Sequence, residues 1–241
     1  MSRYEVDLSY GMEKLTSTVG KHPLGTKGKL PNGNTFRYSF IDGAVTGGKL
    51  LQTKVAPADD DLNVVVAAAA AIGARSISVT TVSAILADEY LDGFLYVNDG
   101  PGEGQAFRLG SHLAAAAAAT LVLNLASNEK VITALTVASL VGLKWNKYKD
   151  VIVFPVTVTG VPVGFTPCDV ADNYYFWAQV AGDGAVLIDS TVLAGKGVIP
   201  SDNAATPGAV EAQVDAGGDD PIVGWVNNPI SVDTDYGHIT V

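Results

Sequence analysis

Short apolar runs, broken by Gly, Pro, Asn and Asp about every ten residues, dominate the chain beyond Ala74. Within the run at 76–81, Ile77 and Val79 alternate with serine and threonine. This alternation is typical of a strand with one buried and one solvated face. Many short strands at this spacing predict a mainly β protein, a barrel or sandwich with at most short helices.

Glycine clusters mark two expected hairpins. A glycine-rich segment at 98–104 separates two β-type runs, and its Gly-x-Gly-x-Gly spacing differs from that of a dinucleotide-binding loop. A strand follows it, whereas a phosphate cradle needs a helix N-terminus, so we expect a turn there and no phosphate site. Glycines on either side of Asp183 predict a second hairpin, between the runs at 174–180 and 185–188.

The aromatic run at 174–180 is apolar on both faces. In a strand, Tyr174 and Phe176 point to one side and Tyr175 and Trp177 to the other. Such a strand must be covered on both sides. We therefore expect these four residues either to lie in the core of the domain or to form a self-association surface.

Of two alanine-rich stretches, 64–72 and 113–123, the first is open to two interpretations. Alanine favours a helix, which Gly73 would end, whereas the three valines at 64–66 favour a strand. Both stretches are shorter than the roughly 18 to 20 apolar residues that span a bilayer, so we expect no membrane partner.

Composition and charge restrict the class of protein. Hydrophobic residues make up 48% of the 241 residues and charged residues 17%, which excludes disorder driven by charge repulsion. The single cysteine, Cys168, excludes an intramolecular disulfide framework. The formal net charge of −10 would repel phosphates, so we expect no nucleic-acid partner.

The charge is unevenly distributed along the chain. Residues 1–54 carry eight basic against four acidic residues, and residues 55–241 carry seven against 21. The first segment is also rich in glycine and turn residues, which predicts an extended N-terminal arm at 1–33 that folds poorly by itself. The rest is expected to form a β-rich body, either continuous or divided near Asp150 into parts at 34–150 and 151–241.

Candidate catalytic and metal-ligating residues are few. His22, His112 and His238 show no helical metal-site spacing, and we expect each to lie in a loop or at the surface. Cys168 has no base beside it in the sequence, so we expect an inert thiol. The Ser-x-x-Lys at 127–130 lies between β-type runs and predicts a turn. We accordingly expect no enzyme activity, no cofactor and no metal.

Basic and aromatic residues interleave at 144–149, a pattern that in a nucleic-acid-binding protein would suggest stacking and phosphate contacts. In so acidic a chain we expect a surface turn instead.

A series of glycine and aromatic motifs between residues 64 and 201 carries a resemblance to a known family. After the alanine-rich stretch, the motifs are GARSISVT at 73–80, YLDGFLYVND at 90–99, GEGQAFRLGSH at 102–112, NKY at 146–148, VGF at 163–165, YFWAQ at 175–179 and GKGVIPS at 195–201. In this order the chain resembles virion structural proteins of tailed bacteriophages, of the type that decorates or cements the capsid. The motifs carry no functional residue across.

The resemblance implies a non-enzymatic protein on the outer surface of the head, whose partner is the major capsid protein. Self-association as a homotrimer is also expected, because closed symmetry combines weak arm contacts into strong binding. An acidic body suits the outside of a shell whose inside faces DNA. The basic arm would then reach acidic groups on the shell, and deleting it should leave the body folded but unable to dock. The expected docking residues are Arg3, Lys14, Lys21, Lys27 and Lys29.

The alternative is a receptor- or glycan-binding module displayed on the virion. Trp145, Trp177 and Trp225 would supply stacking, and exposed Asp and Asn side chains would supply hydrogen bonds.

Overall fold

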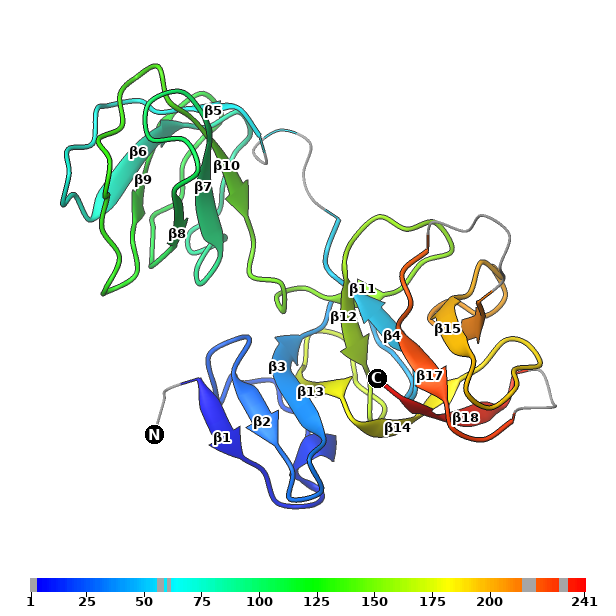
Figure 1. Ribbon diagram of the computed structural model, residues 1–241. Coiled ribbons are helices and arrows are strands. Elements are labelled where there is room, and N and C mark those ends of the chain that lie inside the picture. The colour runs from blue at the N-terminus through cyan, green and yellow to red at the C-terminus, as the bar shows by residue number, and fades with distance from the viewer. Residues whose placement is uncertain (1–3, 56–58, 60–61, 214–219, 230–233) are drawn as a thin grey trace. The chain divides into compact units, whose positions relative to one another are not determined.

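The computed structural model divides the chain into two compact units, which Figure 1 shows as a ribbon. Unit 1 comprises residues 1–55 and 147–241, and unit 2 comprises residues 56–146. The structure describes residues 4–55, 59, 62–213, 220–229 and 234–241. The predicted parts at 34–150 and 151–241 cut across these units, because unit 2 is inserted into the sequence of unit 1.

Unit 1 is built on a sheet of seven strands. In sheet order they are β1 (Glu5–Asp7), β2 (Lys27–Lys29), β3 (Thr35–Phe40), β13 (Tyr175–Ala181), β12 (Pro162–Phe165), β4 (Leu50–Gln52) and β11 (Ile152–Val153). β1 pairs with β2 in parallel, and the other neighbours pair antiparallel. One 3-10 turn, η1 (Met12–Lys14), lies between β1 and β2.

A second sheet completes unit 1. Its five strands, in sheet order, are β14 (Asp183–Leu187), β18 (Tyr236–Thr240), β17 (Gly224–Val226), β15 (Gly197–Pro200) and β16 (Val210–Ala212). Leu50 of β4 and Phe165 of β12 share one buried cluster with Val186, Val198 and Ile239 of this sheet. The two sheets therefore pack in a sandwich-like arrangement around a common core.

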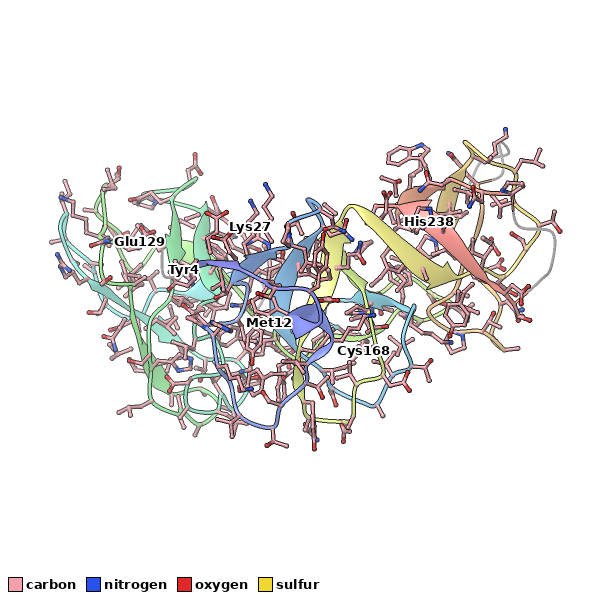
Figure 2. The ribbon with its side chains drawn as sticks, turned by 90° about the horizontal axis from the view of Figure 1, so that it is seen from below. Tyr4, Met12, Lys27, Glu129, Cys168 and His238 are labelled. Carbon is pink, nitrogen blue, oxygen red and sulfur yellow. The ribbon has the colours of Figure 1, made fainter. Side chains whose placement is uncertain are left out.

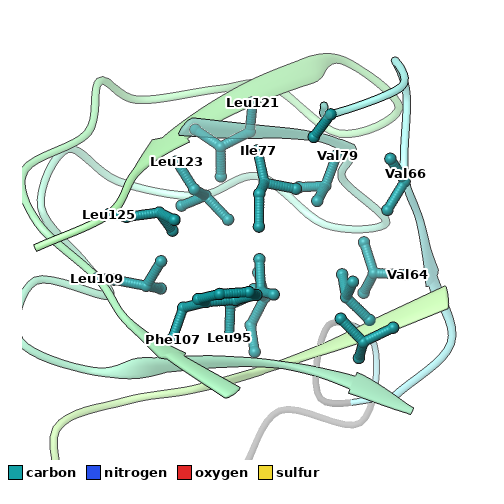
Figure 3. Close-up of a cluster of buried hydrophobic side chains, with 14 of the residues drawn as sticks. Val64, Val66, Ile77, Val79, Leu95, Phe107, Leu109, Leu121, Leu123 and Leu125 are labelled. Carbon is teal, nitrogen blue, oxygen red and sulfur yellow. The ribbon is translucent and has the colours of Figure 1, made fainter. Parts of the chain in front are cut away.

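Unit 2 has two further sheets. One has the order β5 (Val64–Val65), β10 (Leu140–Lys144), β7 (Phe94–Asp99) and β8 (Ala106–Arg108), and the other pairs β6 (Ser76–Thr80) with β9 (Thr120–Asn124). Figure 3 shows the side chains of the two sheets facing each other, with Ile77 and Leu121 on one side and Leu95 and Phe107 on the other. The alternation of apolar and polar residues places one face of each strand in this core.

Both units contain loops in which an isolated β-bridge is followed by a tight turn and then by a strand. Three pairs of such loops are joined by reciprocal backbone hydrogen bonds of 2.8–3.0 Å, between Val45 and Val170, Ala70 and Leu135, and Ile85 and Ala115. In five of these six loops the third residue after the bridge has a positive φ angle. These residues are Gly48, Gly73, Asp88, Ala118 and Asn173. The loops satisfy backbone polar groups within each unit and turn the chain into the next strand.

The mainly β class predicted from the sequence is confirmed, and within the described residues no sheet closes into a barrel. The hairpin expected around 98–104 is present, since β7 and β8 pair antiparallel. The stretch at 64–72 is extended, with β5 and bridges at Val66 and Ala70 in place of a helix. In the described part of the chain, no helix is long and apolar enough to span a membrane.

The hairpin expected between 174–180 and 185–188 is wrong. β13 pairs with β3 and β12, whereas β14 pairs with β18 of the other sheet. The chain passes from one sheet to the other at Gly182, which has φ +94°. Asn34 stabilises this crossing, because its amide donates to the carbonyl of Asp183 and its side-chain oxygen accepts from the Asp183 N–H.

Candidate docking surface

The described part of the predicted arm is not a free arm but part of the seven-stranded sheet. β1 and β2 lie within residues 1–33, and Leu8 and Leu30 pack with Phe36, Tyr38 and Trp177 in one buried cluster. The glycine-rich sequence is extended, as expected. It is ordered because it covers an aromatic face that the rest of the sheet would leave exposed.

Residues 8–24, here called the covering segment, lie over that aromatic face. The Lys21 N–H donates to the Tyr38 hydroxyl at 3.0 Å, and Ser17 forms a bridge with Tyr175. The His22 ring lies 5.2 Å from that of Tyr38 and 5.3 Å from that of Trp177. Burial, and secondly the charge of Lys21, lower the pKa of His22.

Basic side chains gather on the opposite face of the same sheet. Phe36 and Tyr38 of β3 point toward the covering segment, so Arg37 between them points away from it. Lys27 of β2 is the strand partner of Arg37, and Lys29 lies two residues further on the same face. Lys27 forms an ion pair with Glu5 of β1 at 3.4 Å and is partly exposed; its position on the outside of the unit is visible in Figure 2.

The turn that contains Lys147 and Tyr148 lies beside Arg37. The Arg37 guanidinium and the Lys147 ammonium each lie 5.9 Å from the centre of the Tyr148 ring, within the range of a cation–π contact. Burial, and secondly the charge of Arg37, lower the pKa of Lys147. Burial raises the pKa of the Tyr148 hydroxyl. We call Lys27, Lys29, Arg37 and Lys147 the basic cluster.

A small, mainly apolar cavity adjoins the basic cluster. Its volume is about 240 Å³, and its lining includes Lys147, Tyr148, Pro162, Val163 and Phe165. A partner could place an apolar side chain in this cavity and a neighbouring acidic side chain against the basic cluster. Side chains that fill a desolvated pocket are typical of interface hot spots.

The structure separates the five residues predicted to dock. Lys27 and Lys29 belong to the basic cluster, whereas Lys14 and Lys21 lie in the covering segment on the other side of the sheet. Arg3 lies outside the described residues. Sequence reasoning missed Arg37 and Lys147; the interleaved basic and aromatic residues at 144–149 were the signal for Lys147.

The aromatic run of β13 is covered on both faces within its own unit. Phe176 is fully buried with Ala178 and Val163, and Trp177 is 4% exposed in the cluster under the covering segment. Tyr174 and Tyr175 are partly buried against these clusters. Of the two alternatives, core burial and a self-association surface, core burial therefore fits the positions of all four residues in this structure.

Three of the candidate chemical residues, His112, Cys168 and Ser127, make contacts within the fold. His112 lies in a loop, as expected, and is buried there: its Nε2 accepts from the Tyr90 N–H at 3.0 Å. Burial raises the pKa of Cys168, whose thiol donates to the carbonyl of Lys14, the last residue of η1. Figure 2 labels Cys168 and Met12 of η1. Ser127 lies in a turn held by Arg75. Among the described residues, no group of three or more His, Cys, Asp or Glu side chains is placed to hold a metal ion.

The three tryptophans differ in exposure. Trp177 is buried, and Trp145 stacks on Tyr90 at the edge of the core of unit 2. Trp225 of β17 is 53% exposed. Of the three, Trp225 is therefore the one available for stacking against a ligand.

No protein-family model, curated protein or solved structure matches this chain.

Proposed function

We propose that this chain is a non-enzymatic decoration protein that docks on the outer surface of the icosahedral head of a tailed phage. The observation that carries the proposal is the basic cluster, whose four cations outnumber the two carboxylates beside them on β1, Glu5 and Asp7, on one face of a protein whose net charge is −10. A local positive patch on an acidic protein selects an acidic partner surface and orients the protein on it. The partner is the major capsid protein.

Docking by a folded face replaces docking by a flexible arm. Strand pairing fixes the backbone of Lys27, Lys29 and Arg37, and the Arg37 guanidinium is further held by its hydrogen bond to the Gly25 carbonyl at 2.9 Å. Cations that are already positioned lose less conformational freedom on binding than those of a disordered arm. The adjoining cavity adds an apolar contact, which is needed because each exposed ion pair contributes only about 0–1 kcal/mol.

Self-association as a trimer belongs to the same proposal. A threefold assembly would present three basic clusters to a shell of repeated subunits, and linked weak contacts bind far more tightly than single ones. Light scattering after size exclusion should give a mass about three times 24.9 kDa. A monomeric mass at micromolar concentration would remove this part of the proposal.

The test of docking compares charge reversal within the basic cluster with charge reversal at lysines outside it. The docking variant is K27E/K29E/K147E; Arg37 is kept because it supports Gly25. The matched control is K14E/K21E/K196E, which makes the same change in net charge at three exposed lysines outside the cluster. Binding is measured by co-sedimentation with DNA-free heads assembled from the major capsid protein of the same phage.

We expect the docking variant to lose most of its binding at about 50 mM salt and the control to keep it, with a smaller difference between them at about 500 mM because of screening. Equal binding by the two variants would show that the basic cluster does not mediate docking. Failure of the unaltered protein to bind heads at any salt would remove decoration itself.

A further inference from the structure

The outer face of the five-stranded sheet carries an exposed indole beside four polar side chains. Strand register places Asp183 of β14, Thr240 of β18, Trp225 of β17 and Gly197 of β15 in one row across the sheet. The alternate residues, such as Ile239, point into the core. The row therefore lies on the face turned away from the core.

The polar residues of this face are joined in one hydrogen-bond network. The Thr240 hydroxyl donates to Asp183 Oδ1. The side-chain nitrogen of Asn227 lies 3.3 Å from the same oxygen, 2.9 Å from Thr240 Oγ1 and 3.0 Å from Nδ1 of His238, which Figure 2 labels. The hydrogen bond from Thr240 is the main cause that lowers the pKa of Asp183, so this carboxylate is ionised at neutral pH.

Two side chains next to strands of the seven-stranded sheet or within it, Asn34 and Gln179, hold the backbone of Asp183 in place. The Asp183 carbonyl accepts hydrogen bonds from the side-chain amides of Asn34 at 2.8 Å and Gln179 at 2.9 Å. These contacts tie the end of β14 to the seven-stranded sheet of the same unit. A face whose polar groups are already oriented binds a ligand with a smaller loss of conformational freedom.

The indole of Trp225 is open to a flat partner. Its cross-strand neighbour on β15 is Gly197, which has no side chain, and the Gln213 amide lies over that glycine. A large aromatic residue left 53% exposed forgoes much of the stabilisation that burial would provide. An exposed indole beside oriented hydrogen-bonding groups offers a ligand both an apolar surface and polar partners.

We propose that this face binds a neutral saccharide. A sugar ring has an apolar C–H face that stacks on an indole, and its hydroxyls both donate and accept, which matches the mixed donors and acceptors of Asp183, Asn227, His238 and Thr240. The ionised Asp183 disfavours acidic sugars, and residues 150–241 carry 12 acidic residues against one basic residue, Lys196. This site shares no residue with the basic cluster, so it stands or falls independently of capsid docking.

The probe is a printed array of neutral and sialylated oligosaccharides, read with the full chain and with W225A. The matched control is F94A, which removes an aromatic side chain of similar exposure, 50%, from unit 2. We expect binding to at least one neutral glycan, at least a tenfold loss in W225A, and no loss in F94A. The second variant, N227A, should also weaken binding while leaving the indole in place.

A direct measurement follows the indole itself. Because Trp177 is buried and Trp145 is stacked, acrylamide should quench chiefly Trp225, and the bound glycan should protect it from quenching. Three results on the array would overturn the proposal: no neutral glycan retained, binding unchanged in W225A, or preferred binding of sialylated glycans. A fall in oligomeric mass in W225A would also overturn it, since the indole would then be covered by a second copy of the chain.

Discussion

Gly28 of β2 lies directly against the indole of Trp177 on β13. A Cβ at Gly28 would be 2.8 Å from Trp177 Cζ3 and 2.6 Å from Leu8 Cδ1, closer than carbon atoms approach in folded proteins. The absence of a side chain at this position therefore lets the covering segment, β2 and the aromatic core pack together. This contact makes the N-terminal segment part of the folded unit.

We predict that G28A lowers the free energy of unfolding of unit 1 by about 1–3 kcal/mol, because the added methyl group overpacks the contact between Leu8 and Trp177. Urea denaturation followed by tryptophan fluorescence measures the change. G110A is the control, since a Cβ there would meet its nearest neighbours, the carbonyl oxygens of Asn124 and Leu125, at 3.4 Å, an ordinary contact. A loss in G28A no larger than in G110A would contradict the packing account.

Deletion of residues 1–33 should unfold unit 1 rather than release a stable body. The deletion removes β1, β2 and the covering segment and exposes Phe36, Tyr38 and Trp177, each of whose burial is worth about 1.5–3 kcal/mol. A red-shifted tryptophan emission and binding of a hydrophobic dye would report the exposure. A cooperative thermal transition with unchanged emission would show instead that the body folds without the segment.

Several features of the fold can be predicted from local sequence patterns. The alternation of Ile77 and Val79 with polar residues corresponds to β6, and the glycine-rich turn at 98–104 joins β7 and β8. These features depend on residues close together in the sequence, which is why the sequence predicts them well.

The remaining features depend on contacts between distant residues. The packing of Gly28 against Trp177 turns an apparently flexible segment into two strands, and no local pattern reveals the partner. The basic cluster likewise joins Arg37 to Lys147 through the shared ring of Tyr148. The sequence shows an excess of basic residues among the first 54 positions. It does not show on which face of the sheet their side chains lie.

Ala118 has φ +56°, a left-handed conformation that its Cβ disfavours. It occupies the position that Gly48 and Gly73 fill in the equivalent loops. We predict that A118G stabilises unit 2 by about 0.5–1 kcal/mol, because relief of strain exceeds the added entropy of the unfolded chain. A117G, at a neighbouring exposed alanine without a positive φ, should have the opposite sign. Thermal denaturation of the two variants decides the matter; a loss of stability in both would exclude strain at Ala118.

His22 should make the stability of unit 1 depend on pH. Burial against Tyr38 and Trp177 and the charge of Lys21 lower its pKa below the ordinary value of 6.5, so the unfolded chain takes up the proton more readily than the folded one. The resulting contribution to the free energy of unfolding is therefore fully present above pH 6.5 and falls as the pH decreases through that value toward the folded-state pKa. Urea denaturation of the natural chain and H22Q at about pH 8 and about pH 5.5 isolates this effect from that of the carboxylates, which both proteins share. The gap in stability between the two proteins should narrow at the lower pH, and a gap that stays constant or widens would show that the His22 proton is not linked to folding.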